Sequence, residues 1–208
     1  MVKNKKILLL SFITVVLISQ SITFGQEVRV YHEFKPQTEA DQINHTLYKL
    51  ANGFFVYEDW WQINEKNQRC LFGVLKDKEN FQTVFRSKGE GDSYCLDLSF
   101  FMTSQKDDPI IILGEVGAEY SWGVRVFFMN KTEITDAGFL NVGIDAKEGI
   151  IETVHSVIPY TQITTNGNLF KFTFTKDVIY ENENFDSIKK EGIYYTYEKG
   201  IFKETIIK

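Results

Sequence analysis

Ile110-Ile111-Ile112-Leu113 and Val124-Arg125-Val126-Phe127-Phe128-Met129 are the two segments that decide the predicted fold. Both are largely apolar and lack the alternation of a half-exposed strand. Successive side chains of a β-strand point to opposite faces of the sheet, so a continuous apolar run needs cover on both faces. We therefore predict two central strands that are buried on both sides.

The strands predicted around this centre alternate between apolar and polar residues, which is typical of strands with one buried face. In Tyr94–Met102 the even-numbered residues are all apolar, and in Asn168–Thr175 three phenylalanines alternate with lysine and threonine. Further strands are predicted at Val28–Phe34, Phe54–Tyr57, Trp60–Ile63, Arg69–Lys76, Phe81–Ser87, Gly138–Ile144, Ile150–Ile158, Tyr160–Thr165, Ile193–Glu198 and Ile201–Ile207.

Short polar turns separate most of these strands. Asn166-Gly167 is the clearest, because both residues tolerate the positive φ angles of a tight hairpin. Connections of this length leave no room for crossover helices, so neighbouring strands should be antiparallel. We predict a mainly β fold, an antiparallel meander that forms a sandwich or a partly closed barrel.

One short N-terminal helix is predicted at about residues 38–52, packed on the sheet. Thr38 is a candidate N-cap, and Asn52-Gly53 is a typical helix end. Ile43, Leu47 and Leu50 have the spacing of one apolar helix stripe.

The first 25 residues predict a cleaved export signal. Three lysines precede a largely apolar run from Ile7 to Ile18, which is shorter than the roughly 20 residues that span a bilayer. Thr23 and Gly25 are small residues at the two positions that are read for cleavage, so Gln26 is the expected start of the mature chain. We expect the mature chain, residues 26–208, to be one β-rich domain in the periplasm or outside the cell.

Removal of residues 1–25 removes three of the 23 basic residues and none of the 28 acidic ones, so the net charge changes from −5 to −8. Such an acidic chain repels phosphate, so nucleic acid is excluded as a partner class. No second apolar run of spanning length follows, so we expect no stable membrane insertion after cleavage.

Cys70 and Cys95 are the only cysteines. In an oxidising compartment their default state is a disulfide, which we predict. A simple meander would place their strands two spacings apart, about 9.6 Å, whereas a disulfide needs Cα atoms within about 7 Å. Either the middle strand swings out, or the bond joins strand ends, or both thiols stay free.

The sequence offers weak signals for catalysis. Glu115 and Glu119 lie beside a glycine-containing turn and could act as a carboxylate pair in a small secreted hydrolase. His32, His45 and His155 lack the spacing of metal ligands, and no nucleotide-binding fingerprint is present. We expect no metal and no cofactor, and a solvated hairpin end is the plainer interpretation of the two glutamates.

Glu58-Asp59-Trp60-Trp61 is the strongest candidate for ligand binding. If both indoles lie in a strand, they point to opposite faces, so one can join the core while the other faces solvent or the helix. An exposed indole beside carboxylates can bind a sugar ring or a partner side chain. Tyr120 and Trp122 could extend this surface if their turn lies nearby.

These observations favour an exported, non-catalytic binding protein whose ligand is another protein or a glycan. The alternatives are the hydrolase that uses Glu115 and Glu119, and a structural component of the envelope. A pocket with paired carboxylates would favour the enzyme, and a flat aromatic patch would favour binding.

Overall fold

The structure is a computed structural model that describes residues 27–40, 45–51, 53–78, 80–91, 93–148, 151–180 and 186–207. Strands make up 72% of it and helix 2%, which confirms the mainly β prediction. Every strand pair among the described residues is antiparallel. The predicted export signal, residues 1–25, lies outside the described residues. The described residues contain no helix long and apolar enough to cross a membrane.

The strands form four sheets. The central sheet has the order β12 (Glu133–Leu140), β11 (Ser121–Asn130), β10 (Ile110–Gly117), β9 (Cys95–Met102) and β2 (His32–Phe34). The C-terminal sheet has the order β1 (Val28–Val30), β15 (Thr161–Asn166), β16 (Leu169–Phe174), β19 (Ile193–Glu198) and β20 (Ile201–Ile206).

The other two sheets flank this pair. The small sheet has the order β14 (Ile151–His155), β13 (Val142–Glu148), β17 (Val178–Tyr180) and β18 (Ser187–Ile188). The N-terminal sheet has the order β3 (Gln37–Ala40), β4 (Thr46–Ala51), β5 (Phe54–Ile63), β6 (Lys66–Asp77) and β7 (Asn80–Arg86), and β8 (Glu90–Gly91) also pairs with β6. A 3-10 turn, η1 (Ile158–Tyr160), precedes β15.

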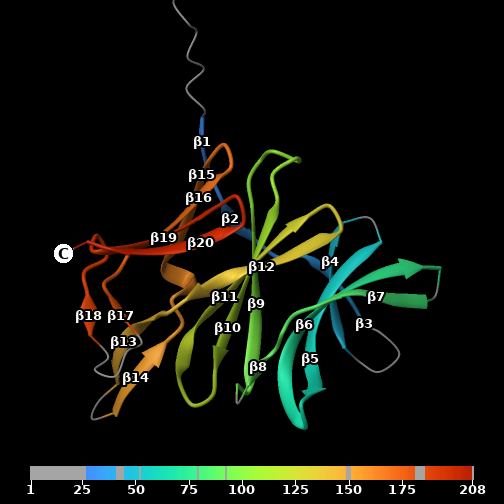
Figure 1. Cartoon of the computed structure of the whole chain (residues 1–208), viewed down its shortest axis with the longest axis horizontal. Helices are drawn as coiled ribbons and strands as arrows, with labels where there is room; N and C mark the ends of the chain where they lie inside the picture. The colour runs from blue at the N-terminus through green and yellow to red at the C-terminus, as the bar shows by residue number, and fades with distance from the viewer. Residues whose placement is uncertain are drawn as a thin grey trace, which may run out of the picture.

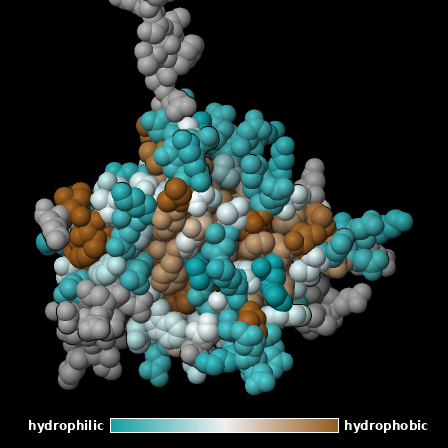
Figure 2. All heavy atoms as spheres, in the orientation of Figure 1, coloured by the Kyte–Doolittle hydropathy of each residue, from teal (hydrophilic) through white to brown (hydrophobic). Residues whose placement is uncertain are grey.

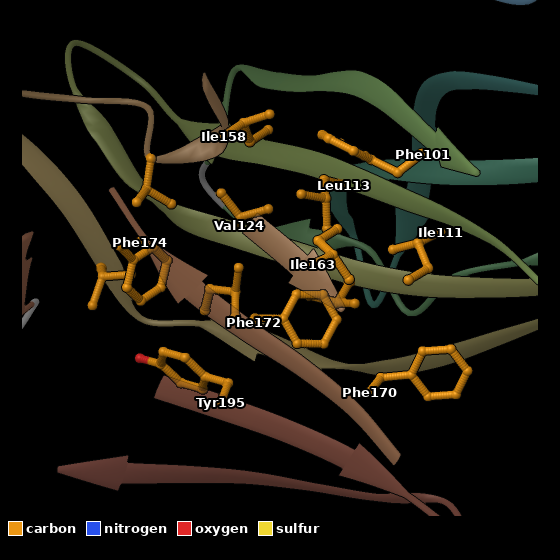
Figure 3. Packing of buried hydrophobic residues seen from close by; sticks show 14 of the residues in the cluster. Phe101, Ile111, Leu113, Val124, Ile158, Ile163, Phe170, Phe172, Phe174 and Tyr195 are labelled. Carbon is orange, nitrogen blue, oxygen red and sulfur yellow. The ribbon is translucent and has the colours of Figure 1, made fainter. Parts of the chain in front are cut away.

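The central sheet is covered on both faces, as its two apolar segments predict. Ile111 and Leu113 of β10 belong to a larger core that also contains Phe172 and Tyr195 of the C-terminal sheet. Figure 3 shows these side chains meeting between the two sheets. Ile112 points the other way, into a smaller core shared with the N-terminal sheet. In Figure 1 the central sheet accordingly lies between the C-terminal sheet and the N-terminal sheet.

The smaller core joins the central sheet to the N-terminal sheet. Its buried members are Phe54, Val56, Leu71, Leu96, Phe100, Ile112, Val116, Phe127 and Met129. Because side chains alternate along a strand, the neighbours Phe55 and Tyr57 point to the opposite, outer face of the N-terminal sheet. On the face shown in Figure 2, hydrophobic residues reach the surface in separate patches between hydrophilic areas.

The predicted helix at residues 38–52 is wrong. Thr38 pairs with Tyr48 in a two-strand ladder between β3 and β4, so it caps no helix. Leu47 is buried with Phe55 on the outer face, whereas Tyr48 and Leu50 pack against the smaller core. The apolar residues therefore follow a period of two and bury both faces of β4. Residues 41–44, including Ile43, and residue 52 lie outside the described residues.

Several strand boundaries also differ from prediction. The segments Phe54–Tyr57 and Trp60–Ile63 form one strand, β5. The predicted strand Gly138–Ile144 is divided between β12 and β13. The hairpin at Asn166 is present, but its two-residue turn is 167–168, because Asn166 already pairs with Leu169. Gly167 has a φ of +60°, the conformation that glycine adopts without strain.

Candidate functional site

A groove on the outer face of the N-terminal sheet is the candidate site, and we name it the outer groove. It has a volume of about 590 Å³ and is open to solvent. It crosses strands β5, β6 and β7 and reaches the residue just before β4. Its lining residues are His45, Tyr57, Asp59, Trp61, Phe72, Thr83, Val84, Phe85 and Arg86.

A row of stacked rings crosses the sheet at this groove. Tyr57 of β5 is the cross-strand partner of Phe72 of β6, and their rings are stacked with centroids 5.0 Å apart. The imidazole of His45 stacks on the other side of Tyr57, with centroids 4.9 Å apart. Since each ring is held by its neighbours, the row is ordered before any ligand arrives.

Trp61 and Arg86 close one end of the row. The indole of Trp61 meets the ring of Phe72 edge-on, with centroids 6.0 Å apart. The guanidinium carbon of Arg86 lies 4.9 Å from the centroid of the Trp61 ring, a cation–π contact. Trp61 nevertheless keeps 46% of its surface exposed. This end therefore presents a large aromatic surface beside a positive charge.

Asp59 supplies the negative group of the groove. Its Oδ2 atom lies 3.1 Å from Nε2 of His45, and its Oδ1 atom accepts a 2.7 Å hydrogen bond from the backbone N–H of Trp60. These two contacts hold the carboxylate beside the imidazole of His45. The groove thus contains both a carboxylate, Asp59, and a guanidinium, Arg86.

A β-bulge in β7 shapes the open side of the groove. The register between β6 and β7 shifts so that Gly73 pairs with Phe85 while Val74 pairs with Thr83. The extra residue, Val84, is 44% exposed and lines the groove. Bulges commonly redirect a side chain in this way.

Glu58 and Trp60 point to the opposite face of β5. Arg69 lies 2.6 Å from Glu58 through Nη1 and Oε2, and its guanidinium lies 4.8 Å from the centroid of the Trp60 ring. Arg69 also donates a hydrogen bond from Nε to the carbonyl of Tyr94. Burial raises the pKa of Glu58, against the opposing effect of Arg69. Neither residue lines the outer groove.

The two tryptophans do lie on opposite faces, but the expectation that one of them joins the core is wrong. Trp60 is 39% exposed and Trp61 is 46% exposed. The reason is the length of β5, whose buried residues are Phe54, Phe55 and Val56 at its beginning. The pair lies in the second half of the strand, beyond the core.

The other candidate aromatic residues lie elsewhere. Tyr120, in the turn between β10 and β11, is 42% exposed and contacts Trp122 edge-on with centroids 6.5 Å apart. Trp122 packs against the smaller core. Neither side chain lines the outer groove, so they do not extend it. In Figure 1 this turn and the turn between β5 and β6 lie apart.

Glu115 and Glu119 differ in burial and in the element to which they belong. Glu115 is half-buried in β10, where its cross-strand partners are Asp97 and Val124. Glu119 is exposed in the turn that follows. Neither glutamate lines the outer groove.

The predicted disulfide between Cys70 and Cys95 is wrong, because both thiols are free. Cys70 lies on the outer face of β6, where Gly89 approaches its sulfur so closely that an added Cβ would lie 2.9 Å from Sγ. Cys95 lies in the central sheet, with its sulfur 3.5 Å from the carbonyl oxygen of Gly117. The two thiols thus belong to different sheets and have different neighbours. Burial raises the pKa of each.

The described residues contain no cluster of three or more histidine, cysteine, aspartate or glutamate side chains that could hold a metal. A second groove of about 630 Å³ adjoins the loop before β10. Its side chains include Lys106, Asp107, Asp108 and Lys131 but no aromatic ring. The outer groove, unlike this second groove, combines aromatic surface with charged side chains.

Comparisons with known proteins add no functional information: no family model, no curated protein and no solved structure matches the chain.

Sequence reasoning identified Asp59 and Trp61 but missed their neighbours Tyr57, Phe72 and Arg86. The alternation of Tyr57, Asp59 and Trp61 is visible once β5 is continued through residues 58 and 59. Phe72 and Arg86 come from other strands, and only the pairing of β5, β6 and β7 brings them to the site.

Proposed function

We propose that this chain is an exported, non-catalytic binding protein that holds its ligand, a protein or a glycan, in the outer groove. The observation that carries the proposal is the ordered aromatic row with Trp61 and Arg86 at its exposed end. Tryptophan, tyrosine and arginine are enriched among the few residues that dominate the binding energy of protein interfaces. Their amphipathic rings also suit the apolar faces of sugars.

Binding is supported by the fact that the side chains of the groove are already held in place. Its aromatic side chains contact one another on adjacent strands of one sheet, so binding needs little further ordering of side chains. These features favour recognition over reaction.

The neighbouring tryptophans provide a matched test. The mature chain, beginning at Gln26, is screened against a glycan array and against a phage-displayed library of random 12-residue peptides. Calorimetry then compares the affinity of the selected ligand for wild type, Trp61→Ala and Trp60→Ala. We expect Trp61→Ala to weaken binding at least about tenfold, equivalent to about 1.4 kcal/mol.

Trp60→Ala is the control, because it removes an indole of similar exposure from the same strand but outside the groove. Its affinity should stay close to that of wild type. Equal losses in the two variants, or no loss in either, would contradict the outer groove as the binding site. N-terminal sequencing of the native protein tests the export part, and an intact Met1 would refute it.

A further inference from the structure

The strand that borders the outer groove, β7, is the last strand of the N-terminal sheet. It pairs with β6 along one edge, and no other strand in the described part of the chain pairs with its second edge. A terminal strand presents part of its backbone N–H and C=O groups outward, where they can pair with another extended chain.

Proteins usually protect such edges with charged side chains, and β7 differs in this respect from the other long terminal strands. Among terminal strands of six or more residues, β12 contains Glu133 and Asp136, and β20 contains Lys203 and Glu204. In β7 the first six residues, Asn80 to Phe85, are uncharged, and the one charge is Arg86 at its end. This edge is therefore the long edge least protected against pairing.

The bulge at Val84 limits where a second strand can pair. Bulges interrupt the regular ladder, so uninterrupted pairing is possible along Asn80–Thr83. Beyond the bulge, an added chain would pass Val84 and reach Arg86, which both line the groove. The edge thus supplies backbone hydrogen bonds, and the groove supplies contacts to side chains.

The cross-strand pairing indicates which position of an added strand would lie opposite Arg86. Tyr57 pairs with Phe72, and Phe72 pairs with Arg86, so the next position in this row lies on the strand added beside β7. Opposite charges at directly facing positions stabilise a sheet. An acidic side chain there would face Arg86, whose guanidinium lies over Trp61.

We infer that the ligand is an extended segment of a partner protein, which adds to the N-terminal sheet as a strand beside β7 and places an acidic side chain opposite Arg86. The inference rests on the proposed function and specifies its ligand. Strand addition derives affinity from main-chain hydrogen bonds and specificity from alternate side chains.

The test uses a peptide selected from the phage-displayed library. In an added strand, alternate N–H groups face β7 and the intervening ones face solvent. We expect N-methylation of one alternate set to lower affinity at least about tenfold, or about 1.4 kcal/mol. Methylation of the other set should leave affinity nearly unchanged. Equal sensitivity of both sets, or of neither, overturns strand addition.

Matched variants of the protein test the edge itself. Val84→Lys adds a charge at an exposed apolar position of β7, and Ile201→Lys adds one at the start of the terminal strand β20. Val84→Lys should abolish peptide binding, whereas Ile201→Lys should retain it. A glycan that depends on Trp61 would overturn this inference while supporting the proposed function. Binding that depends on neither Trp61 nor Val84 would overturn both.

Discussion

Glu58 and Asp59 are adjacent carboxylates in β5 with different surroundings. Asp59 faces the outer groove and contacts His45, while Glu58 lies half-buried on the opposite face beside Arg69. Burial raises the pKa of Glu58 above its ordinary value of 4.5, and the nearby Asp59 and Asp97 add to this rise. Asp59 is thus a candidate ligand-binding residue, whereas the pKa of its neighbour Glu58 changes when the chain folds.

The raised pKa of Glu58 predicts a pH dependence of stability. The folded protein binds this proton more tightly than the unfolded chain, so the contribution of Glu58 to the free energy of unfolding increases as pH falls. The increase begins near the raised pKa and is complete below the ordinary pKa of 4.5 that the unfolded chain has. Relative to Glu58→Gln, wild type should therefore gain stability between pH 7 and pH 4.

Urea unfolding at several pH values measures this difference. Glu119→Gln, at an exposed turn position, is the control for the loss of one carboxylate. A constant difference between wild type and Glu58→Gln would show that Glu58 has the same proton affinity in both states.

At the scale of elements, the contact between the N-terminal and central sheets depends on a glycine in β6. A Cβ atom at Gly73 would lie 2.9 Å from the Phe54 ring, 3.0 Å from Ile134 Cδ1 and 3.2 Å from the Cβ of Phe85. These neighbours belong to packed strands that have little freedom to move. The close approach is part of how the two sheets meet.

Gly73→Ala should therefore lower the free energy of unfolding by about 1–3 kcal/mol through overpacking. Gly91→Ala is the matched control in the same sheet, because its Cβ would find nothing closer than 3.9 Å. The control should be neutral or gain up to about 1 kcal/mol from the lower entropy of its unfolded chain. Chemical denaturation compares the two, and equal effects would contradict the packing argument.

Element type could be predicted where a run was continuously apolar, and the prediction failed where the apolar residues were few and spaced apart. The runs at Ile110–Leu113 and 124–129 identified two central strands, because few other environments accept so many apolar residues. Ile43, Leu47 and Leu50 have the spacing of one helix face, whereas in a strand Leu47 and Leu50 lie on opposite faces, so the spacing favoured a helix. Burial of Leu47 on one face and Tyr48 on the other decides for strand, and it depends on partners distant in sequence.

At the scale of the whole molecule, the central sheet belongs to both cores. Ile111 and Ile112 are neighbours in β10, yet one is buried in the larger core and the other in the smaller core. Loss of either core would expose one face of the same strands. We therefore expect the described chain to unfold in one cooperative transition.

The tryptophans allow this to be tested, because all three lie on the side of the smaller core. Trp60 and Trp61 are in β5, and Trp122 packs on the smaller core from β11. Ile163→Ala, in the larger core, should cost about 2–5 kcal/mol. Its tryptophan-fluorescence transition should shift together with its far-UV circular dichroism transition. A fluorescence transition that stays at the wild-type midpoint would show two independent units.

The candidate site shows the limit of sequence reasoning at this scale. Trp61 and Asp59 are recognisable within one strand, but the groove also needs Phe72 and Arg86 from two further strands. Their positions depend on the register of three strands and on one bulge. Alternation within a strand indicates which face a side chain takes, but it does not identify the residue that lies opposite on the next strand.

The unbonded state of Cys70 and Cys95 has a practical consequence for obtaining the protein. No bond in the described fold is made by oxidation, so reaching the native state consumes no oxidant and requires no disulfide isomerase. Protein produced in a reducing compartment of an expression host should therefore have the same structure as protein produced in an oxidising one. Reducing agents can be kept in every buffer without loss of the fold.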